Sequence, residues 1–236
     1  MNLLVFRRDD LDEEGLLGVS GEQLLHLRQV LDSRAGDTLR VGEIGGRMGQ
    51  AEVLHIDQRR ALLRPALDSN PPPKLPLTLI LALPRPKMLR RVLRAVAEFG
   101  VRELHLVNSY RVEKSFWQTP VLQPDTIAHY LLQGLSQSRD TVLPAVHCQP
   151  RFKPFAEDQL PALAAQRRAL LAQPGEHPPC PRGCEEDTLI AIGPEGGFIP
   201  YEVEKMIAAG LTPVSLGPRI LRVENAVTAL LGRLGP

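Results

Sequence analysis

The sequence predicts an α/β protein in two parts, and three observations support this. Apolar, strand-like runs alternate with helical segments after residue 76, which is typical of a mainly parallel sheet covered by helices. The first 70 residues combine short strands with one helix and suggest a small β-barrel. Between them, Asn70–Pro76 is rich in prolines, which cannot donate backbone hydrogen bonds and form a stiff spacer. We therefore expect domains at 1–70 and 77–236, joined by a linker at 71–76.

The first part is expected to contain a helix that begins at a capping box. Ser20 occupies the N-cap position and Gln23 the N3 position of this pattern. Leu24, Leu27 and Leu31 share one helical face, so the helix should run to about Leu31. Three short strands follow, the first two joined by a glycine-bearing hairpin. They are expected at Thr38–Val41, Gln50–Ile56 and Ala61–Arg64.

The second part should begin with a strand that is buried on both faces. Leu77–Leu83 is a continuous apolar run, as expected in a parallel sheet. Gly100 stands where a helix over Lys87–Phe99 should end. Further strands are expected at Glu103–Val107, Thr141–Val146, Arg168–Ala172, Thr188–Ile192 and Val214–Leu216. Further helices are expected at Pro124–Ser138, Glu157–Ala165, Tyr201–Ala209 and Val223–Leu234.

The net charge of the chain conceals an uneven distribution. A formal charge of +1 over 236 residues argues against a nucleic-acid partner, because phosphate binding needs clustered positive charge. Residues 74–114, however, contain nine basic and three acidic side chains, a local charge of +6. Lys87, Arg90, Arg91 and Arg94 fall within about 100° of one another around the predicted helix, with no acidic residue between them. This pattern favours a phosphate-binding face over an ordinary solvated helix surface, which normally mixes charges of both signs.

The cysteines and the N-terminus indicate a cytoplasmic protein. The N-terminal apolar stretch is short and precedes the charges, unlike a signal peptide, and no segment is long enough to span a membrane. Three cysteines are too few for a secreted disulfide framework. Cys180, Cys184 and His177 resemble a fragment of a zinc site but provide too few ligands, and the other histidines are scattered. No metal is therefore expected.

Two glycine-bearing motifs follow predicted strands and precede predicted helices. The first spans 192–198 (IGPEGGF) and the second 216–226 (LGPRILRVENA). Glycine lets the backbone approach a ligand closely, and a helix N-terminus favours a polar or anionic group. Neither motif is a dinucleotide fingerprint or a P-loop. Because ligands bind beyond the carboxyl ends of strands in open α/β sheets, the two motifs should meet at one crevice. A tight strand–helix connection is the alternative for either motif alone.

These two motifs resemble the signature of the RsmE family, the 16S ribosomal RNA (uracil-N3)-methyltransferases of the SPOUT superfamily. Residues 97–101 (AEFGV) resemble the family's E-L-G-V element, and residues 111–114 (RVEK) its basic R-x-x-K element. Residues 26–31 and 36–37 resemble parts of its N-terminal PUA-like barrel. The sequence departs from the family where Ser136 and Asp140 replace a Glu and an Arg, and where Asn225 replaces a Thr.

The resemblance implies a C-terminal SPOUT methyltransferase domain with a deep trefoil knot and an N-terminal PUA-like barrel that helps to bind RNA. It implies S-adenosylmethionine as cofactor, uridine N3 of 16S ribosomal RNA in the small ribosomal subunit as target, and a homodimer. N3 must lose its proton before it can attack a methyl group, so the base must be unpaired when it is presented. Two alternatives remain: a SPOUT methyltransferase that acts on another RNA, and a non-catalytic RNA-binding or ribosome-assembly protein.

The resemblance also implies roles for individual residues. Residues expected to bind the cofactor are Leu171, Ala172, Ile192, Gly193, Pro194, Gly196, Gly197, Leu216, Gly217, Ile220, Leu221 and Ala226. Residues expected to bind RNA are Lys87, Arg90, Arg91, Arg94, Arg111 and Lys114. Arg222 is expected to stabilise charge on the uracil oxygens or to bind an RNA phosphate. Glu224 is expected to orient Arg222 or the cofactor amine, or to act as the base, and the sequence does not separate these roles.

Overall fold

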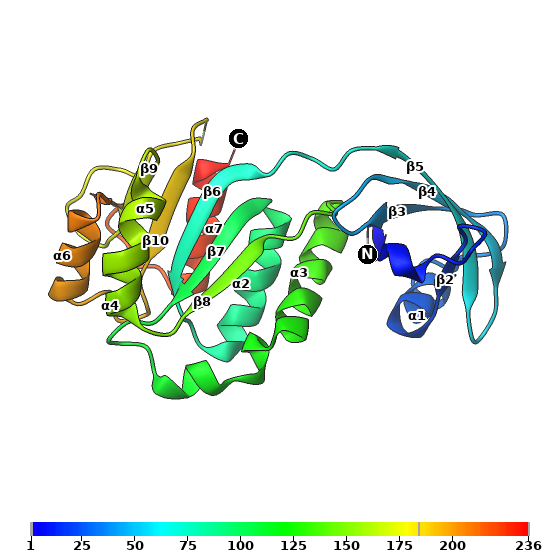
Figure 1. Cartoon of the computed structure of the whole chain (residues 1–236), viewed down its shortest axis with the longest axis horizontal. Helices are drawn as coiled ribbons and strands as arrows, with labels where there is room; N and C mark the ends of the chain where they lie inside the picture. The colour runs from blue at the N-terminus through cyan, green and yellow to red at the C-terminus, as the bar shows by residue number, and fades with distance from the viewer. Residues whose placement is uncertain (1, 184, 236) are drawn as a thin grey trace. The chain divides into compact units, whose positions relative to one another are not determined.

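The computed structural model describes residues 2–183 and 185–235, and the chain divides into two compact units. The first unit contains the residues up to Pro73 together with Leu132–Leu143. The second contains Lys74–Leu131 and the residues from Pro144 onward. Each unit combines helices with a β-sheet (Figure 1), so the predicted α/β class is confirmed.

The first unit is built on a five-stranded sheet in the order β1-β3-β4-β5-β2. β3, β4 and β5 form an antiparallel meander, β2 pairs antiparallel with β5, and β1 pairs parallel with β3. The strands are β1 (Leu4–Phe6), β2 (Leu17–Val19), β3 (Thr38–Glu43), β4 (Met48–Ile56) and β5 (Ala61–Ser69). The sequence analysis did not predict β2, because three residues with a central glycine carry little strand signal.

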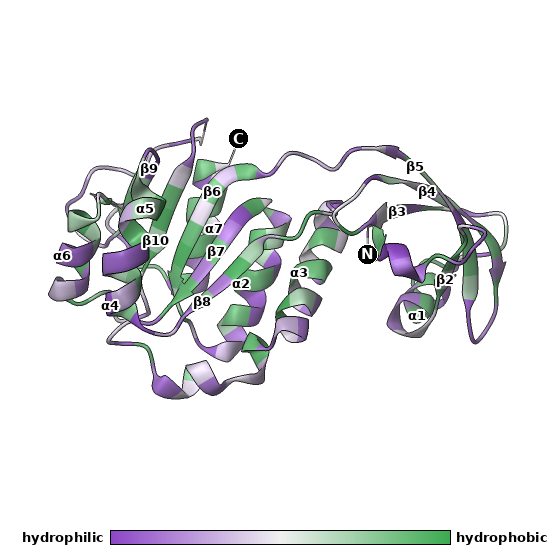
Figure 2. Cartoon of the chain, viewed as in Figure 1, coloured by the Kyte–Doolittle hydropathy of each residue, from purple (hydrophilic) through white to green (hydrophobic). Residues whose placement is uncertain are grey.

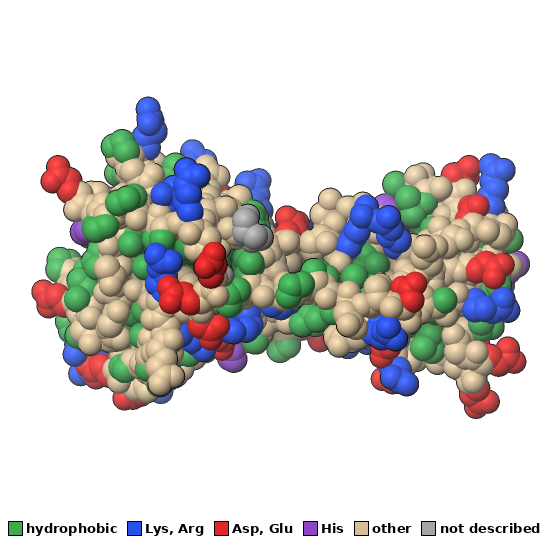
Figure 3. Space-filling view, turned by 90° about the horizontal axis from the view of Figure 1, so that it is seen from above, with side chains coloured by type: hydrophobic (Ala, Val, Ile, Leu, Met, Phe, Trp, Pro, Cys, Tyr) green, Lys and Arg blue, Asp and Glu red, His purple; other side chains and the backbone are tan. Residues whose placement is uncertain are grey.

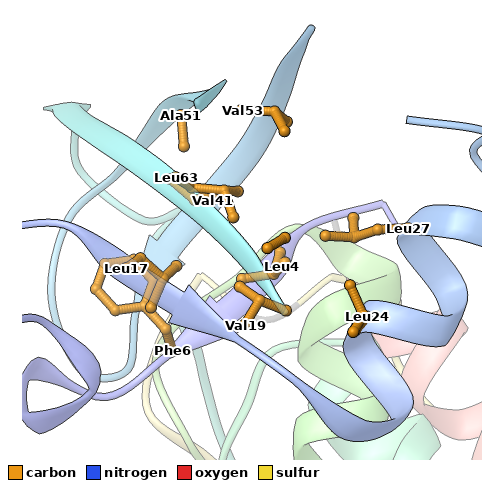
Figure 4. Close-up of a cluster of buried hydrophobic side chains, with 11 residues drawn as sticks. Leu4, Phe6, Leu17, Val19, Leu24, Leu27, Val41, Ala51, Val53 and Leu63 are labelled. Carbon is orange, nitrogen blue, oxygen red and sulfur yellow. The ribbon is translucent and has the colours of Figure 1, made fainter. Parts of the chain in front are cut away.

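Helix α1 (Gly21–Gln29) supplies two leucines to the core of this unit. The core side chains, drawn in Figure 4, are Leu4, Phe6, Leu17, Val19, Leu24, Leu27, Val41, Ala51, Val53, Ala61 and Leu63. The helix was expected to run to about Leu31 but ends at Gln29, and Leu31, expected on the same face as Leu24 and Leu27, is 44% exposed. Ser20 is the N-cap residue, yet its side chain makes no capping bond, and the Gln23 amide donates instead to the carbonyl of Val5 at 2.9 Å.

Residues 132–143 complete the first unit through hydrogen bonds to its backbone. The Ser136 hydroxyl donates to the carbonyl of Leu3 at 2.6 Å, and the Thr141 hydroxyl donates to the carbonyl of Gly46 at 2.7 Å. The Asp140 carboxylate is buried and accepts hydrogen bonds from the next two backbone N–H groups. Two positions at which the sequence departs from the RsmE pattern, Ser136 and Asp140, therefore serve the packing of this unit.

The second unit is built on a parallel sheet of six strands in the order β11-β9-β10-β6-β7-β8. The strands are β6 (Leu75–Ala82), β7 (Val101–Val107), β8 (Ala145–Gln149), β9 (Arg168–Ala172), β10 (Thr188–Ile192) and β11 (Thr212–Val214). β10 is buried throughout and β6 from Leu77 onward, as expected for central strands, and both are largely hydrophobic in Figure 2. β6 begins two residues earlier than predicted because Leu75 already pairs with Val101.

Helices cover both faces of this sheet. Figure 1 shows α2 and α7 on one face and α4 and α5 on the other. The helices are α2 (Pro86–Glu98), α3 (Pro124–Ser138), α4 (Phe152–Pro154), α5 (Leu160–Ala164), α6 (Pro200–Ala208) and α7 (Val223–Leu234), with a π-helical turn at Phe155–Gln159. Within the described ranges, no helix has the length and apolar character needed to cross a bilayer.

Two predicted strands lie elsewhere than expected. The strand predicted at Thr141–Val146 is found at Ala145–Gln149, because Asp140 and Thr141 are engaged in a turn and Pro144 has no N–H to donate. The strand predicted at Val214–Leu216 is found at Thr212–Val214, where it pairs with β9.

Candidate active site

A pocket opens in the second unit where β9, β10 and β11 end. Its wall is formed by the loops that follow these strands and by the first turns of α7. Ten of the twelve residues predicted to bind the cofactor line it. The exceptions are Leu171, which is buried within β9, and Gly196, which lies against Arg111 instead. The structure thus brings the two glycine motifs together, as the rule for strand ends predicts.

Four polar residues in the pocket wall were absent from the set of predicted cofactor-binding residues: Gln173, Glu195, Ser215 and Arg219. Gln173 directly follows β9, and its backbone N–H donates to the carbonyl of Val214 at 2.9 Å, which joins two of the loops. Arg219 lies in the loop after β11. For Gln173, its position directly after a strand was the available signal, because residues at such positions line the crevice of an open sheet.

Glycine is required at two points of the pocket wall. Gly197 has φ +74° and Gly217 has φ +115°, a backbone conformation that L side chains rarely adopt. At Gly193 a Cβ atom would lie 3.1 Å from the ring of Phe198. At these three positions the wall is bare backbone, whose N–H and C=O groups can face a ligand directly.

The loop after β10 is fixed by contacts on its outer side. The Arg111 guanidinium donates to the carbonyl of Gly196, and its Cδ occupies the space that a side chain at that position would need. Arg85 Nε lies 4.0 Å from Glu195 Oε1. The N–H of Gly197 donates to the carbonyl of Pro194 at 2.8 Å within the turn. The structure thus shows Arg111, which was predicted to bind RNA, holding the pocket loop through Gly196.

A buried carboxylate that was not predicted from the sequence connects α6 to the loop after β7. Glu202, in the first turn of α6, is 3% exposed. It accepts hydrogen bonds from the Ser109 hydroxyl at 3.2 Å and from the backbone N–H groups of Tyr110 at 2.7 Å and Ile199 at 3.0 Å. These bonds fix the start of α6 to the loop after β7, the loop that carries Arg111.

The two residues predicted to be catalytic lie at the edge of the pocket. Arg222 is the N-cap residue of α7, and its side chain is exposed. Glu224 is half-buried in the first turn of the same helix. Their neighbours Leu221 and Val223 line the pocket, whereas Arg222 and Glu224 do not form part of its wall. Both residues thus lie next to residues of the pocket wall.

The predicted basic face of α2 is present. Lys87, Arg90 and Arg91 are exposed and Arg94 is half-buried. The guanidinium carbons of Arg94 and Arg90 lie 4.8 Å and 5.9 Å from the centre of the Tyr130 ring, within the range of cation–π attraction. Lys114 is also exposed, at the start of a short 3₁₀ helix. On the face drawn in Figure 3, by contrast, acidic and basic side chains are interspersed.

The loop at 173–187 packs over the end of the chain. The N–H of Cys180 donates to the carbonyl of Ser215 at 2.8 Å, and the N–H of Gly183 donates to the carbonyl of Arg233 in α7 at 2.9 Å. Cys180 is fully buried, and burial raises the pKa of its thiol, which keeps it protonated. Cys184, the other cysteine of the zinc-like fragment, lies outside the described residues.

The parallel sheet and its strand-end pocket are those of an RNA methyltransferase domain: residues 71–235 match the family model described by that name. The chain belongs to the RsmE family. Over 235 residues it is 28% identical to "Ribosomal RNA small subunit methyltransferase E" of Treponema pallidum (strain Nichols), an alignment that covers 97% of this chain and 88% of that protein.

Solved structures share the fold of the whole chain. One is a ribosomal RNA small subunit methyltransferase E from Neisseria gonorrhoeae bound to S-adenosyl methionine, with a TM-score of 0.75 and 20% identity over 98% of this chain and 95% of that one. Another is a probable rRNA-methyltransferase from Porphyromonas gingivalis, with a TM-score of 0.74 and 25% identity over 97% of this chain and 95% of that one.

Proposed function

We propose that this protein transfers a methyl group from S-adenosylmethionine to N3 of a uridine in 16S ribosomal RNA of the small ribosomal subunit. The observation that carries the proposal is the pocket at the ends of β9, β10 and β11, formed by the motifs of the RsmE family. The matched relative is itself called a ribosomal RNA small subunit methyltransferase, and the chain covers 88% of its length.

The chemistry of the pocket suits S-adenosylmethionine. Apolar side chains such as Ile192, Leu216 and Leu230 give flat surfaces for an adenine ring, and the glycine backbone offers hydrogen-bonding groups to its edge. Gly197 and Gly217 leave open the space that side chains would occupy. When bound, the cofactor supplies a methyl carbon on a positively charged sulfur, which leaves as a thioether once the carbon has bonded to N3.

The residues at the pocket edge would handle the charge and the proton of the uracil. N3 carries an acidic imide proton, and its loss places negative charge on O2 and O4. Arg222 has an exposed guanidinium that can reach these oxygens or a neighbouring phosphate. Glu224, in the first turn of the helix, would orient Arg222 or accept the N3 proton.

We propose that the C-terminal part of the chain forms a deep trefoil knot and that the N-terminal part is a PUA-like barrel. The contacts of the loop at 173–187 with Ser215 and with Arg233 support the knot, because they hold this loop over the strand and helix that follow it in sequence. The largely antiparallel five-stranded sheet supports the barrel. In this division, residues 1–70 form the RNA-binding domain, residues 71–76 form the linker, and residues 77–236 form the methyltransferase domain.

We further propose a homodimer that acts in the cytoplasm, where the ribosomal substrate lies. Ile220 and Leu221 line the pocket, yet Ile220 is 82% exposed and Leu221 39% exposed. Apolar side chains in this position are suited to being covered by a second subunit or by the substrate. Sedimentation of the purified protein would report the oligomeric state.

The function is tested by nucleoside mass spectrometry of 16S ribosomal RNA from a strain that lacks the gene. We expect N3-methyluridine to disappear from this RNA and to return when the gene is restored. Purified protein incubated with small subunits from the deletion strain should then restore the modification only when S-adenosylmethionine is added. Unchanged N3-methyluridine in the deletion strain would exclude this target, and methyl transfer to another RNA would identify a different one.

The basic face of α2 leads to a prediction about salt dependence. Changing Lys87, Arg90 and Arg91 together to Gln should weaken RNA binding about tenfold at moderate salt. The slope of log affinity against log salt should fall by about 0.7–0.9 for each phosphate that the altered side chains no longer bind. Arg94 is left intact because it is half-buried and lies closer to the Tyr130 ring than Arg90 does.

The matched control removes equal charge elsewhere in the second unit. Arg151, Lys153 and Arg182 are at least partly exposed, and their triple change to Gln should leave the salt slope unaltered. Binding titrations at several salt concentrations provide the measurement. Equal salt slopes for the two triple variants would show that RNA affinity depends on the net charge of the protein and not on the basic face of α2.

A further inference from the structure

Two histidines and a glutamate that lie far apart in the sequence meet on one face of the parallel sheet. Glu103 and His105 are two positions apart in β7, so their side chains point to the same face of the sheet. His147 of β8 is the direct partner of His105 in the ladder between these strands. The metal-binding atoms of the three side chains all lie within 4.8 Å of one another. Figure 2 shows the start of β7 as a hydrophilic stretch in an otherwise largely hydrophobic sheet.

We propose that Glu103, His105 and His147 form a binding site for a divalent transition-metal ion, with Zn²⁺ as the best match. Two imidazoles and one carboxylate form a ligand set that zinc accepts, with water in a fourth position. This site is independent of the methyltransferase pocket, whose wall contains none of the three residues.

The distances suit such an ion. The Nε2 atoms of His147 and His105 lie 3.0 Å and 3.2 Å from the same oxygen of Glu103, Oε1. In a tetrahedral zinc site with bonds of about 2.0–2.1 Å, neighbouring ligand atoms are about 3.3 Å apart. An ion could therefore be bound with small side-chain rotations and no change of the strands.

His105 gives a second, independent indication. Its side chain is 5% exposed, its Nε2 faces Glu103 Oε1 at 3.2 Å, and its Nδ1 has no hydrogen-bond partner among the described residues. A buried ring nitrogen without such a partner is costly, since buried polar groups are nearly always paired. The ring stacks on that of His147 at a centroid distance of 4.6 Å, which keeps both imidazoles beside the carboxylate.

The surroundings orient the carboxylate and leave a path for the ion. The Thr78 hydroxyl donates to Glu103 Oε2 at 3.3 Å, so Oε1 is the oxygen that faces the histidines. Arg167 donates to the Thr78 hydroxyl at 3.1 Å, and its positive charge is offset by Asp187, 3.9 Å from its Nε. His147 has a side-chain exposure of 44%, which opens one side to solvent.

The ion would link an edge strand to its neighbour in the sheet. Among the described strands, β8 stands at the edge of the sheet and pairs with β7. Since His147 comes from β8 and the other two ligands from β7, the metal would crosslink these strands. Binding should therefore raise the thermal stability of the protein, because an ion that binds only the folded state shifts the unfolding equilibrium.

The test titrates Zn²⁺ into the full-length, chelator-treated protein in competition with a chromophoric zinc indicator. We expect one zinc ion per chain, and at least about 30-fold weaker binding in His147→Gln and in Glu103→Gln. Cys148→Ser alters the residue next to His147, whose side chain points to the other face of the strand, and should bind as the wild type does. His177→Gln, in the zinc-like fragment of the loop at 173–187, should also bind normally.

Two further measurements test the coordination of the ion and its effect on stability. Co²⁺ bound to the wild type should give the intense visible bands of a four-coordinate site, and His147→Gln should lose them. Zinc should raise the melting temperature of the wild type but not that of His147→Gln, whose metal-free melting temperature should match the wild type. Failure to find one-to-one binding at micromolar zinc, or wild-type affinity in His147→Gln, would overturn the proposal.

Discussion

Changing Gly217 to Val should weaken the binding of S-adenosylmethionine at least about 100-fold, which corresponds to about 2.7 kcal/mol. Gly217 has φ +115°, where a β-branched residue is strained, and it lines the pocket. No atom lies within 4 Å of a Cβ built at this position. The valine therefore meets no clash that would prevent folding, but it forces the loop after β11 to change its path and fills space that the cofactor needs.

The chain contains a matched control for this strain. Gly175 has φ +117° and lies in the loop after β9, but it is not part of the pocket wall. Its change to Val introduces a similar backbone conflict and should alter cofactor affinity less than about threefold. Calorimetric titration of both variants gives the comparison. Similar losses in the two variants would mean that backbone strain alone accounts for the effect and that Gly217 has no special place in the site.

The pocket could be predicted from the sequence because its residues come in two short continuous motifs. Each motif follows an apolar strand, and parallel strands bring their carboxyl ends to one edge of the sheet. Gly193 and Gly217 could therefore be assigned to one crevice without knowledge of the strand order. The cation face of α2 was predictable for a similar reason, since helical periodicity alone places Lys87, Arg90 and Arg91 together.

Features that depend on distant pairing could not be found in this way. Glu202 bonds to Ser109, 93 positions away in the sequence, so neither residue reveals the other. His105 and His147 meet only because β7 and β8 are neighbours in a particular register. The strand predicted at Thr141–Val146 was displaced for the same reason, because Thr141 bonds to Gly46, 95 positions away.

Local sequence motifs also gave wrong predictions where a side chain forms its hydrogen bond with a residue that is distant in the sequence. The capping-box pattern at Ser20 predicted a bond between Gln23 and the start of α1, yet the Gln23 amide reaches the carbonyl of Val5 in β1 instead. Similarly, Ser136 and Asp140 depart from the family pattern, but both form hydrogen bonds within the first unit. At these two positions, the residues that depart from the family pattern are thus engaged in hydrogen bonds within the first unit.

Changing Arg222 to Ala should lower the rate of methyl transfer about 100- to 1000-fold, which is the usual cost of removing a group that stabilises developing negative charge. Arg222 is exposed at the N-cap of α7 and does not line the pocket, so the affinity for S-adenosylmethionine should stay within about threefold of the wild type. The measurement is a single-turnover rate with saturating small subunits and cofactor, together with a calorimetric titration of the cofactor.

Two further variants show whether Arg222 acts through its charge and whether its effect on the rate is specific to its position. Arg222→Lys keeps the charge but loses the planar fork of the guanidinium, so it should recover part of the rate if charge on the uracil oxygens is what the residue stabilises. Arg219→Ala removes a guanidinium three positions earlier, on the pocket wall, and should act on cofactor affinity more than on the rate. A wild-type rate in Arg222→Ala would remove Arg222 from the chemistry. A loss that higher RNA concentration restores would instead assign Arg222 to phosphate binding, because it would then contribute equally to the ground state and the transition state.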